Sequence, residues 1–357
     1  MLVTRACLFV SLGLACALAG AGCGSGARVE ARARAAAAAF LARYVAPDGR
    51  VVRLDQGGDT VSEGQAYALL LAEAAGRTAT FRRVWGWTKA HLSRPDGLLA
   101  YHADATGVLD AEPAADADLL AAWALTRYRG PRPSAYLQDG RRLAAAVLAN
   151  ELAYPRAGDP VLAAGPWATP LPAWIDPSYF APLAFAGLDE ALPDGRWRAL
   201  ERNAVSLTSA LAAGGHVLPP DWASLAAGGA IAPRPPPSGT PDRVQYGLEA
   251  QRIVVWFASA CDRNARALAA HWRRLLHGSA EAAIALSPSG QVQDGAEAPL
   301  PLVAAAAAAG AAGDAHARDR LLDRAQGLND RHPTYYGAAW VALGRVLLTT
   351  HLLGGCA

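Results

Sequence analysis

The sequence predicts an all-α protein built as one large domain. Ala and Leu are abundant and long alternations of β-branched residues are few, which favours helices over strands. Twelve segments carry the apolar periodicity of a helix, and Gly, Pro, Asn or Asp breaks separate most of them. No repeat of fixed length is visible, so a regular solenoid is disfavoured. The length of 357 residues would by itself allow two or three domains.

The first 22 residues are typical of an export signal. Arg5 precedes an apolar run over residues 6–21, which is too short and too rich in small residues for a membrane span. Residues 19–23 resemble the cleavage site of a bacterial lipoprotein, so we expect Cys23 to become the first mature residue and to carry lipid. The protein is then exported and anchored in the cell envelope through lipid, or secreted if no lipid is attached.

Cysteine positions bear on the same compartment. Cys7 and Cys16 would leave with the signal, and Cys23 would carry the lipid, which leaves Cys261 and Cys356 in the mature domain. In an exported protein these two could form a disulfide that ties the C-terminus to the body. Two buried free thiols are the alternative, because a sequence does not give the distance between them.

A short Gly/Ser spacer over residues 23–30 is expected to precede a single domain over residues 31–357. The expected helices are Val29–Tyr44, Glu63–Ala75, Ala79–Leu92, Asp116–Tyr128, Ser134–Leu152, Ser178–Leu188, Gly195–Ala213, Leu248–Ala260, Asn264–Leu276, Leu300–Ala312, Ala315–Gln326 and Thr334–Leu353. Residues 153–177 and 214–246 are Pro-rich and carry little helix signal. Loops of that length in a compact domain are usually functional, and we expect these two to form the walls of a binding cleft.

Two acidic motifs open helices about fifty residues apart. Ser62 and Gln65 have the spacing of a capping box, which predicts a helix start with Glu63 in its first turn. Asp116 and Asp118 open a second apolar helix. A single Glu at such a position would be explained as a complement to the helix dipole. Two carboxylates at two helix starts instead suggest a functional pair.

Together these motifs resemble glycoside hydrolase family 8, in particular the cellulases that accompany bacterial cellulose synthases. The resemblance covers roughly residues 30 to 350. Its landmarks are Ser62-Glu63-Gly64-Gln65-Ala66-Tyr67, Ala114-x-Asp116-Ala117-Asp118, Asp48-Gly49-Arg50-Val51-Val52, Trp87-Thr88, Asp176-Pro177-Ser178-Tyr179, Pro220-Asp221-Trp222, Glu249-Ala250-Gln251-Arg252 and Tyr335-Tyr336. It implies an (α/α)6 barrel of alternating inner and outer helices, and an inverting enzyme that cuts internal β-1,4 bonds of a glucan such as cellulose.

The resemblance also implies roles for the acidic residues. Glu63 matches the proton donor, although a helix start favours the ionised form and an acid needs a raised pKa, so burial and a neighbouring carboxylate must outweigh the dipole. Asp116 matches the residue that contacts and distorts the sugar at the cleavage point, and its first-turn position predicts that it stays ionised. Asp118 points elsewhere, and capping or packing explains it better than catalysis.

The base is expected at Glu249, where the related cellulases carry Asp in a Tyr-Asp-Ala-x-Arg motif. In this chain the motif reads Leu248-Glu249-Ala250-Gln251-Arg252, with Tyr246 displaced by two residues. Glu keeps the acid-base chemistry and reaches one methylene further, and Arg252 becomes a substrate-binding residue. The competing explanation is an i,i+3 ion pair on the surface. If Glu249 is not the base, Asp118, Asp176 and Asp242 are the next candidates.

Aromatic residues are frequent in the regions expected to line the cleft. Flat rings pack on the apolar faces of sugars, yet most tryptophans of a helical domain belong to the core. By motif position we expect Trp87, Tyr101 and Tyr179 to contact sugar. The remaining candidates are Trp85, Trp167, Trp174, Trp222 and Tyr246.

Other function classes find no support in the composition. With 33 basic and 31 acidic residues the formal charge is +2, which gives no electrostatic case for nucleic acid. Neither zinc-ligand spacing nor a Gly-x-Ser-x-Gly nucleophile motif occurs, so no metal or cofactor is expected. The expectation is a monomer whose partner is a β-glucan. The alternatives are a weakened carbohydrate-binding protein on the same fold, or an enzyme for chitosan, xylan or mixed-linkage glucan.

Overall fold

A computed structural model describes residues 13–356, and for residues 13–25 it describes the backbone alone. The start of the predicted signal and the Cys23 side chain therefore lie outside the described residues. Within the described range the chain forms twelve α-helices, as expected. They are α1 (Gly13–Tyr44), α2 (Ser62–Ala74), α3 (Thr78–His91), α4 (Ala115–Arg127), α5 (Pro133–Asn150), α6 (Pro182–Ala191), α7 (Gly195–Leu211), α8 (Gln251–Ser259), α9 (Arg263–Trp272), α10 (Pro299–Ala311), α11 (Ala315–Arg331) and α12 (Tyr335–Thr349).

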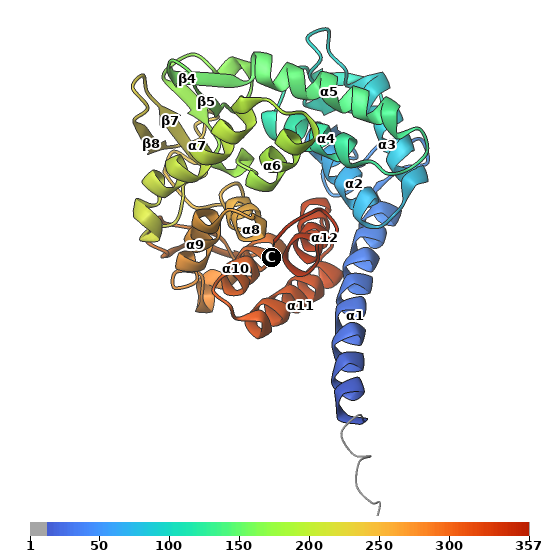
Figure 1. Cartoon of the computed structure of the whole chain (residues 1–357). Coiled ribbons are helices and arrows are strands. Elements are labelled where there is room, and N and C mark those ends of the chain that lie inside the picture. The colour runs from blue at the N-terminus through green and yellow to red at the C-terminus, as the bar shows by residue number, and fades with distance from the viewer. Residues whose placement is uncertain (1–12, 357) are drawn as a thin grey trace, which may run out of the picture.

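The helices form two concentric rings (Figure 1). The even-numbered helices contact one another in order, and α12 returns to α2, so they close an inner ring. Each odd-numbered helix packs on an even-numbered neighbour from outside. This alternation is the (α/α)6 barrel that the resemblance implied.

Side-chain size separates the two rings. The inner helix α10 is buried from Pro299 to Ala309 and is made largely of Ala, which lets neighbouring helices approach closely on every side. The outer helix α11 buries only one face and carries Arg and Asp elsewhere. A helix surrounded by protein is apolar all round, whereas a surface helix is amphipathic.

Short strands occupy the segments expected to be irregular loops. The strands are β1 (Thr60–Val61), β2 (His102–Ala103), β3 (Val108–Asp110), β4 (Leu152–Arg156), β5 (Asp159–Leu162), β6 (Ala173–Ile175), β7 (Trp222–Leu225), β8 (Ile231–Arg234), β9 (Ala283–Leu286) and β10 (Val292–Glu297). The middle strand β7 pairs antiparallel with both β6 and β8, so the two predicted loops join in one three-stranded sheet. These segments form strands because they pair with segments distant in the sequence, and a local sequence pattern does not reveal such pairing.

The first helix extends further toward the N-terminus than predicted. The expected spacer at residues 23–30 is helical, because α1 runs without a break from Gly13 to Tyr44 and projects from the barrel (Figure 1). Helix propagation costs less than nucleation, and the Arg34–Glu30 ion pair at 2.9 Å adds i,i+4 support. In the described part of the chain, no helix is long and apolar enough to cross a membrane.

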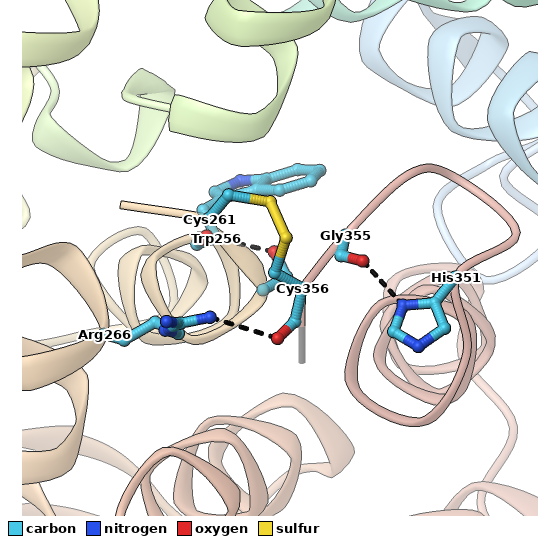
Figure 2. Close-up of a disulfide and its surroundings, with 7 residues drawn as sticks. Trp256, Cys261, Arg266, His351, Gly355 and Cys356 are labelled. Carbon is cyan, nitrogen blue, oxygen red and sulfur yellow. Dashed lines mark hydrogen bonds between the residues drawn. A yellow bond between two sulfur atoms is a disulfide. The ribbon is translucent and has the colours of Figure 1, made fainter. Parts of the chain in front are cut away.

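Of the two alternatives for Cys261 and Cys356, the structure contains the disulfide (Figure 2). It joins the residues just after α8 to the C-terminal tail that follows α12. The Cys356 amide donates to the Ser259 carbonyl at 3.2 Å, and Arg266 donates to the Cys356 carbonyl at 3.1 Å. The tail is therefore held by backbone contacts as well as by the covalent bond.

Replacing both cysteines by serine should lower the free energy of unfolding by about 2–4 kcal/mol, because the bond closes a long loop in the unfolded chain. The sequence separation of the pair is 95 residues. Denaturant unfolding without reductant measures the difference, and adding a thiol reductant should lower the midpoint of the parent but not of the double variant. Equal midpoints for parent and variant would show that the bond contributes nothing.

Candidate active site

The predicted site residues meet where inner helices begin. Glu63 lies in the first turn of α2, Asp116 in the first turn of α4, and Arg252 in the first turn of α8. Asp176 caps a short 3-10 helix, Pro177–Tyr179, just before α6. Four segments that are distant in sequence thus deliver charged groups to one end of the inner ring.

The Arg252 guanidinium is the centre of this cluster. Its side chain is only 2% exposed, and its Nη1 donates to Asp116 Oδ2 at 2.9 Å. Glu63 Oε2 lies 3.6 Å from the same nitrogen, and the Tyr67 hydroxyl lies 3.4 Å from it. The i,i+3 ion pair with Glu249 that was considered for Arg252 is present, but it is not a surface pair, because Arg252 is a buried cation with several anionic partners.

The other guanidinium nitrogen, Nη2, faces a second set of acceptors. Ser178 Oγ lies at 2.5 Å and Asp176 Oδ2 at 3.3 Å, and Glu249 Oε2 is also in contact. Glu249 is the most open of the cluster's carboxylates, with 44% of its side chain exposed. Glu63, the candidate acid, and Glu249, the candidate base, therefore contact different nitrogens of the Arg252 guanidinium.

Burial raises the pKa of Glu63 to about 7. The Arg252 charge opposes this shift, and the negative charges of Asp116 and Glu249 reinforce it. The side chain of Glu63 keeps 18% of its surface open to solvent. Desolvation and neighbouring carboxylates thus outweigh the helix dipole, which is the condition that the acid role requires.

The surroundings of Asp116 differ in part from the prediction. Burial raises its pKa, Arg252 lowers it, and the charge of Glu249 raises it. Its first-turn position was expected to keep it ionised, but that expectation ignored the loss of water around an almost fully buried carboxyl. The close ion pair with Arg252 is what favours its ionised form.

The start of α2 is not held by a capping box. Val61 is the N-cap and makes no side-chain cap bond, whereas Ser62 lies inside the helix with its amide donating to the Tyr101 carbonyl at 2.8 Å. Gln65 instead accepts from the Val51 amide at 2.6 Å and donates to Thr88 Oγ1 at 2.7 Å. The motif therefore ties α2 to a preceding loop and to α3.

Close packing explains why the residue next to Glu63 is a glycine. A Cβ on Gly64 would lie 2.5 Å from the Tyr335 hydroxyl, and that ring is buried against Phe40 and Tyr44. Only a residue without a side chain lets the start of α12 approach the start of α2 this closely.

Asp221 organises the turn that carries Glu249. Its Oδ1 accepts from the Gly247 and Ala250 amides at 2.7 and 2.9 Å, and its Oδ2 accepts from Gln245 at 3.0 Å. Burial raises the pKa of Asp221 to about 6, against these hydrogen bonds. The Asp221 carboxyl therefore fixes the backbone on both sides of Glu249.

A cavity of about 520 Å³ opens beside Glu249. Its walls come largely from residues 221–249, so one of the two predicted cleft segments does border the site. Trp222 lines this cavity and meets Trp174 edge to face across the β6–β7 pair. The Arg234 guanidinium lies 3.1 Å from the centre of the Trp174 ring.

Two of the three predicted aromatic contacts face the cluster. The Arg252 guanidinium lies 5.4 Å from the Tyr179 ring centre. Burial raises the pKa of Tyr101 to about 12, and the charge of Glu63 adds to the shift. Trp87 is different: it belongs to the outer helix α3, is 6% exposed and stacks on His91, so the prediction of a sugar contact gives way to a packing role.

Sequence reasoning gave no role to several residues that touch the cluster. Tyr67, Ser178, Asp221 and Tyr336 were noted only as parts of motifs, yet Tyr67 and Ser178 contact Arg252, and Tyr336 lies 3.4 Å from the Leu248 carbonyl. The available signal was their adjacency to Glu63, Asp176 and Tyr335. Asp242, one alternative base, is exposed in the cleft wall.

Comparisons with known proteins find a matching family and similar enzymes. The family model described as "Glycosyl hydrolases family 8" matches residues 22–351. A probable endoglucanase of Novacetimonas hansenii is 32% identical over 234 residues, 61% of this chain and 64% of that protein. An endoglucanase of Cellulomonas uda is 30% identical over 205 residues, 54% of this chain and 56% of that protein. The matches thus span less than two thirds of these relatives.

Among solved structures, endo-beta-1,4-glucanase CMCax from Acetobacter xylinum is similar with a TM-score of 0.70 and 26% identity. The similarity covers 87% of this chain and 96% of that one.

A second pair of buried carboxyls lies behind Asp116. Asp118 and Glu151 are both fully buried, and Asp118 Oδ1 accepts from the Leu99 amide at 2.9 Å. Burial raises the pKa of each well above its usual range, and the charge of Asp118 adds to the shift on Glu151. The packing role expected for Asp118 fits this position, whereas its service as a base does not.

Glu151→Gln should make the protein more stable at alkaline pH. A carboxyl whose pKa is higher in the folded state than in the unfolded state loses stability as pH rises, by up to about 1.4 kcal/mol per pH unit. The gain from Gln should therefore be small near pH 5 and should grow toward pH 8, as measured by urea unfolding. Glu190→Gln, at an exposed position of α6, is the control. An equal destabilisation at both pH values would mean that ionised Glu151 has a stabilising partner.

Proposed function

The chain belongs to glycosyl hydrolases family 8, and from this premise we propose that it is an endo-acting β-1,4-glucanase that hydrolyses a cellulose-like polysaccharide with inversion. The names of its relatives support this substrate class. One observation carries the proposal above the others. A carboxyl with a pKa near 7 shares a buried guanidinium with a second, solvent-open carboxylate.

Glu63 is the proton donor in this proposal. Hydrolysis of a glycoside needs an acid that protonates the leaving oxygen, and such an acid works best with a pKa near the working pH. A Glu with a pKa of about 7 is half protonated there. Its partly open side chain leaves a path to the bound sugar.

Asp116 and Arg252 form the floor of the cleavage subsite. An Asp116 held ionised by Arg252 accepts hydrogen bonds from sugar hydroxyls and stabilises the positive charge that develops on the ring. Tyr101 and Tyr179 line the same region and offer ring faces or hydroxyls to the sugar. Arg252 keeps the acidic groups of this floor together.

Glu249 is the base that activates water. It is the cluster's most exposed carboxylate and borders the cavity of about 520 Å³, so a water molecule can reach it. Inversion requires the base to act on the face of the sugar opposite the acid. The position of Glu249 on the far nitrogen of Arg252 from Glu63 favours that assignment.

The alternative function is carbohydrate binding without turnover. The observation that favours it is the contact of Glu249 with Arg252, which leaves the base with a competing partner. Release of reducing ends from carboxymethylcellulose separates the two functions. A panel with chitosan, xylan and mixed-linkage glucan then identifies the polysaccharide.

We also propose export, cleavage before Cys23 and lipid attachment there, with α1 linking the anchor to the barrel. The Cys261–Cys356 disulfide supports an oxidising compartment. The expected form is a monomer in the cell envelope.

Glu63→Gln should lower kcat by at least about 10²-fold on polysaccharide, because Gln has nearly the same shape and no proton to give. An aryl cello-oligosaccharide with a good leaving group needs less acid assistance and should lose less. In the parent, kcat/KM should fall about tenfold per unit above pH 7 as Glu63 ionises. A variant that keeps half of the parent rate would rule out this acid.

Glu249→Ala should lower kcat by about 10²- to 10⁴-fold, because water is no longer activated. Azide needs no deprotonation and should restore part of the rate on an activated substrate. Glu249→Asp should cost around 10²-fold through retraction of the carboxylate by about one ångström. Asp242→Asn, an exposed carboxylate of the same wall, is the matched control. A Glu249→Ala enzyme as active as the parent would move the base elsewhere.

Cys23→Ala should shift the protein from the membrane fraction to the soluble fraction of fractionated cells, because the lipid anchor is lost. Mass spectrometry of the parent's N-terminal peptide checks the modification directly. Membrane association that is unchanged in the variant would point to an uncleaved apolar segment.

A further inference from the structure

Asp176 has no role in the mechanism above, although it lies inside the cluster. Its side chain is fully buried, and its Oδ1 accepts from the Ser178 amide at 2.8 Å. Its Oδ2 lies 3.3 Å from Arg252 Nη2, next to Glu249. Two carboxyls, one buried and one open, therefore converge on one nitrogen.

Counting hydrogens shows that this nitrogen cannot serve all its neighbours. A guanidinium Nη carries two hydrogens. Three acceptors surround Nη2: Ser178 Oγ, Glu249 Oε2 and Asp176 Oδ2, of which Asp176 is the most distant. The two shorter contacts compete for these hydrogens, so the buried Oδ2 of Asp176 keeps the longest of the three contacts, at 3.3 Å, beside a hydrogen bond from the Ser178 side chain. A second ionised carboxyl, fully buried beside Glu249 and held by these contacts alone, is costly unless it carries a proton itself.

The groups around Asp176 favour the same distribution of charge. Arg252 faces it from α8 and Glu249 from the turn before α8, and the Ser178 and Tyr179 side chains lie on its own 3-10 helix. Asp116, on α4, acts on the neighbouring Tyr179. One cation is thus shared among several acids. When two neighbouring carboxyls cannot both ionise, the proton stays on the one that is more buried.

We propose that Asp176 is the positioning residue of the base: it remains protonated and donates a hydrogen bond from its carboxyl to Glu249, which holds the Glu249 carboxyl in a fixed orientation toward the cleft. This proposal rests on the function proposed above and gives that site a fourth acidic member. Burial raises the pKa of Asp176 well above its usual range, and the charge of Glu249 and a hydrogen bond to it add to the shift.

The proton count of the reaction stays balanced with Asp176 neutral throughout. Glu63 gives one proton to the leaving oxygen, and Glu249 takes one from the attacking water. Solvent exchange then returns Glu63 to its acid form and Glu249 to its ionised form. Asp176 neither gives nor takes a proton, so its effect on the rate comes only from the orientation of Glu249.

The test compares Asp176→Asn with Asp176→Ala. Asn keeps the size and offers an N–H to Glu249 at every pH, so its kcat should stay within about tenfold of the parent. Ala removes the donor and should lower kcat by about 10²-fold with little change in KM. The parent should lose activity steeply at high pH, where Glu63 and Asp176 both ionise, and Asp176→Asn should show the shallower loss of a single group.

Infrared difference spectra provide a readout without turnover. The parent minus Asp176→Asn spectrum near neutral pH should contain the C=O stretch of a protonated carboxyl. Its absence would overturn the proposal whatever the activity, and its presence in an inactive protein would locate the failure in the proposed function instead. Thermal unfolding of each variant checks that the fold is kept.

Asp221→Asn is the matched control, because Asp221 accepts three hydrogen bonds and an amide cannot accept them all. It should lose more activity than Asp176→Asn. If Asp176→Asn is instead as impaired as Asp176→Ala, the residue acts as an ionised acceptor and the proposal fails.

Discussion

The buried guanidinium of Arg252 is the interaction on which the site depends. Four carboxyl groups approach it, from Glu63, Asp116, Asp176 and Glu249. One positive charge cannot neutralise four negative ones in a site with little water, so the cluster retains protons at neutral pH. The proton that an acid catalyst must hold is therefore a property of the whole cluster. Removing the cation would leave several buried carboxyls without a counter-charge.

The fold offsets part of the electrostatic cost of placing four carboxyl groups together. The starts of the inner helices present unpaired backbone amides and the positive end of their dipoles, which partly offset the excess of negative charge. Ala-rich inner helices such as α10 pack closely enough to bring those starts together. Asp221 and Gln65 then fix, through backbone contacts, the two segments that carry Glu249 and Glu63. The same helix starts therefore close the inner ring and hold the charged groups in place.

Patterns in the local sequence predicted the features that depend mainly on residues close together in the chain. Apolar periodicity with Gly, Pro and Asp breaks located the twelve helices of residues 13–356, most within a few residues, and the acidic motifs located Glu63 and Asp116. Contacts between distant segments produced the differences. Ser62 is not a cap because its amide pairs with the Tyr101 carbonyl, and residues 214–246 form strands because β6 is there to pair with them. Asp176 acquires its environment from Arg252, 76 positions further along the chain.

The covalent bond at the other end of the barrel limits how the site can move. Helix α8 spans about 13 Å between the turn that carries Glu249 and the residues that precede Cys261. The disulfide fastens that far end to the tail of α12, whose own first residues, Tyr335 and Tyr336, lie at the site. Because the disulfide joins α8 and α12 at one end, these helices cannot move apart at the other end without bending. Any movement that widens this end of the barrel must therefore occur in the strand-bearing wall at residues 221–245, while the helix starts that hold Arg252 and its carboxyl partners stay fixed.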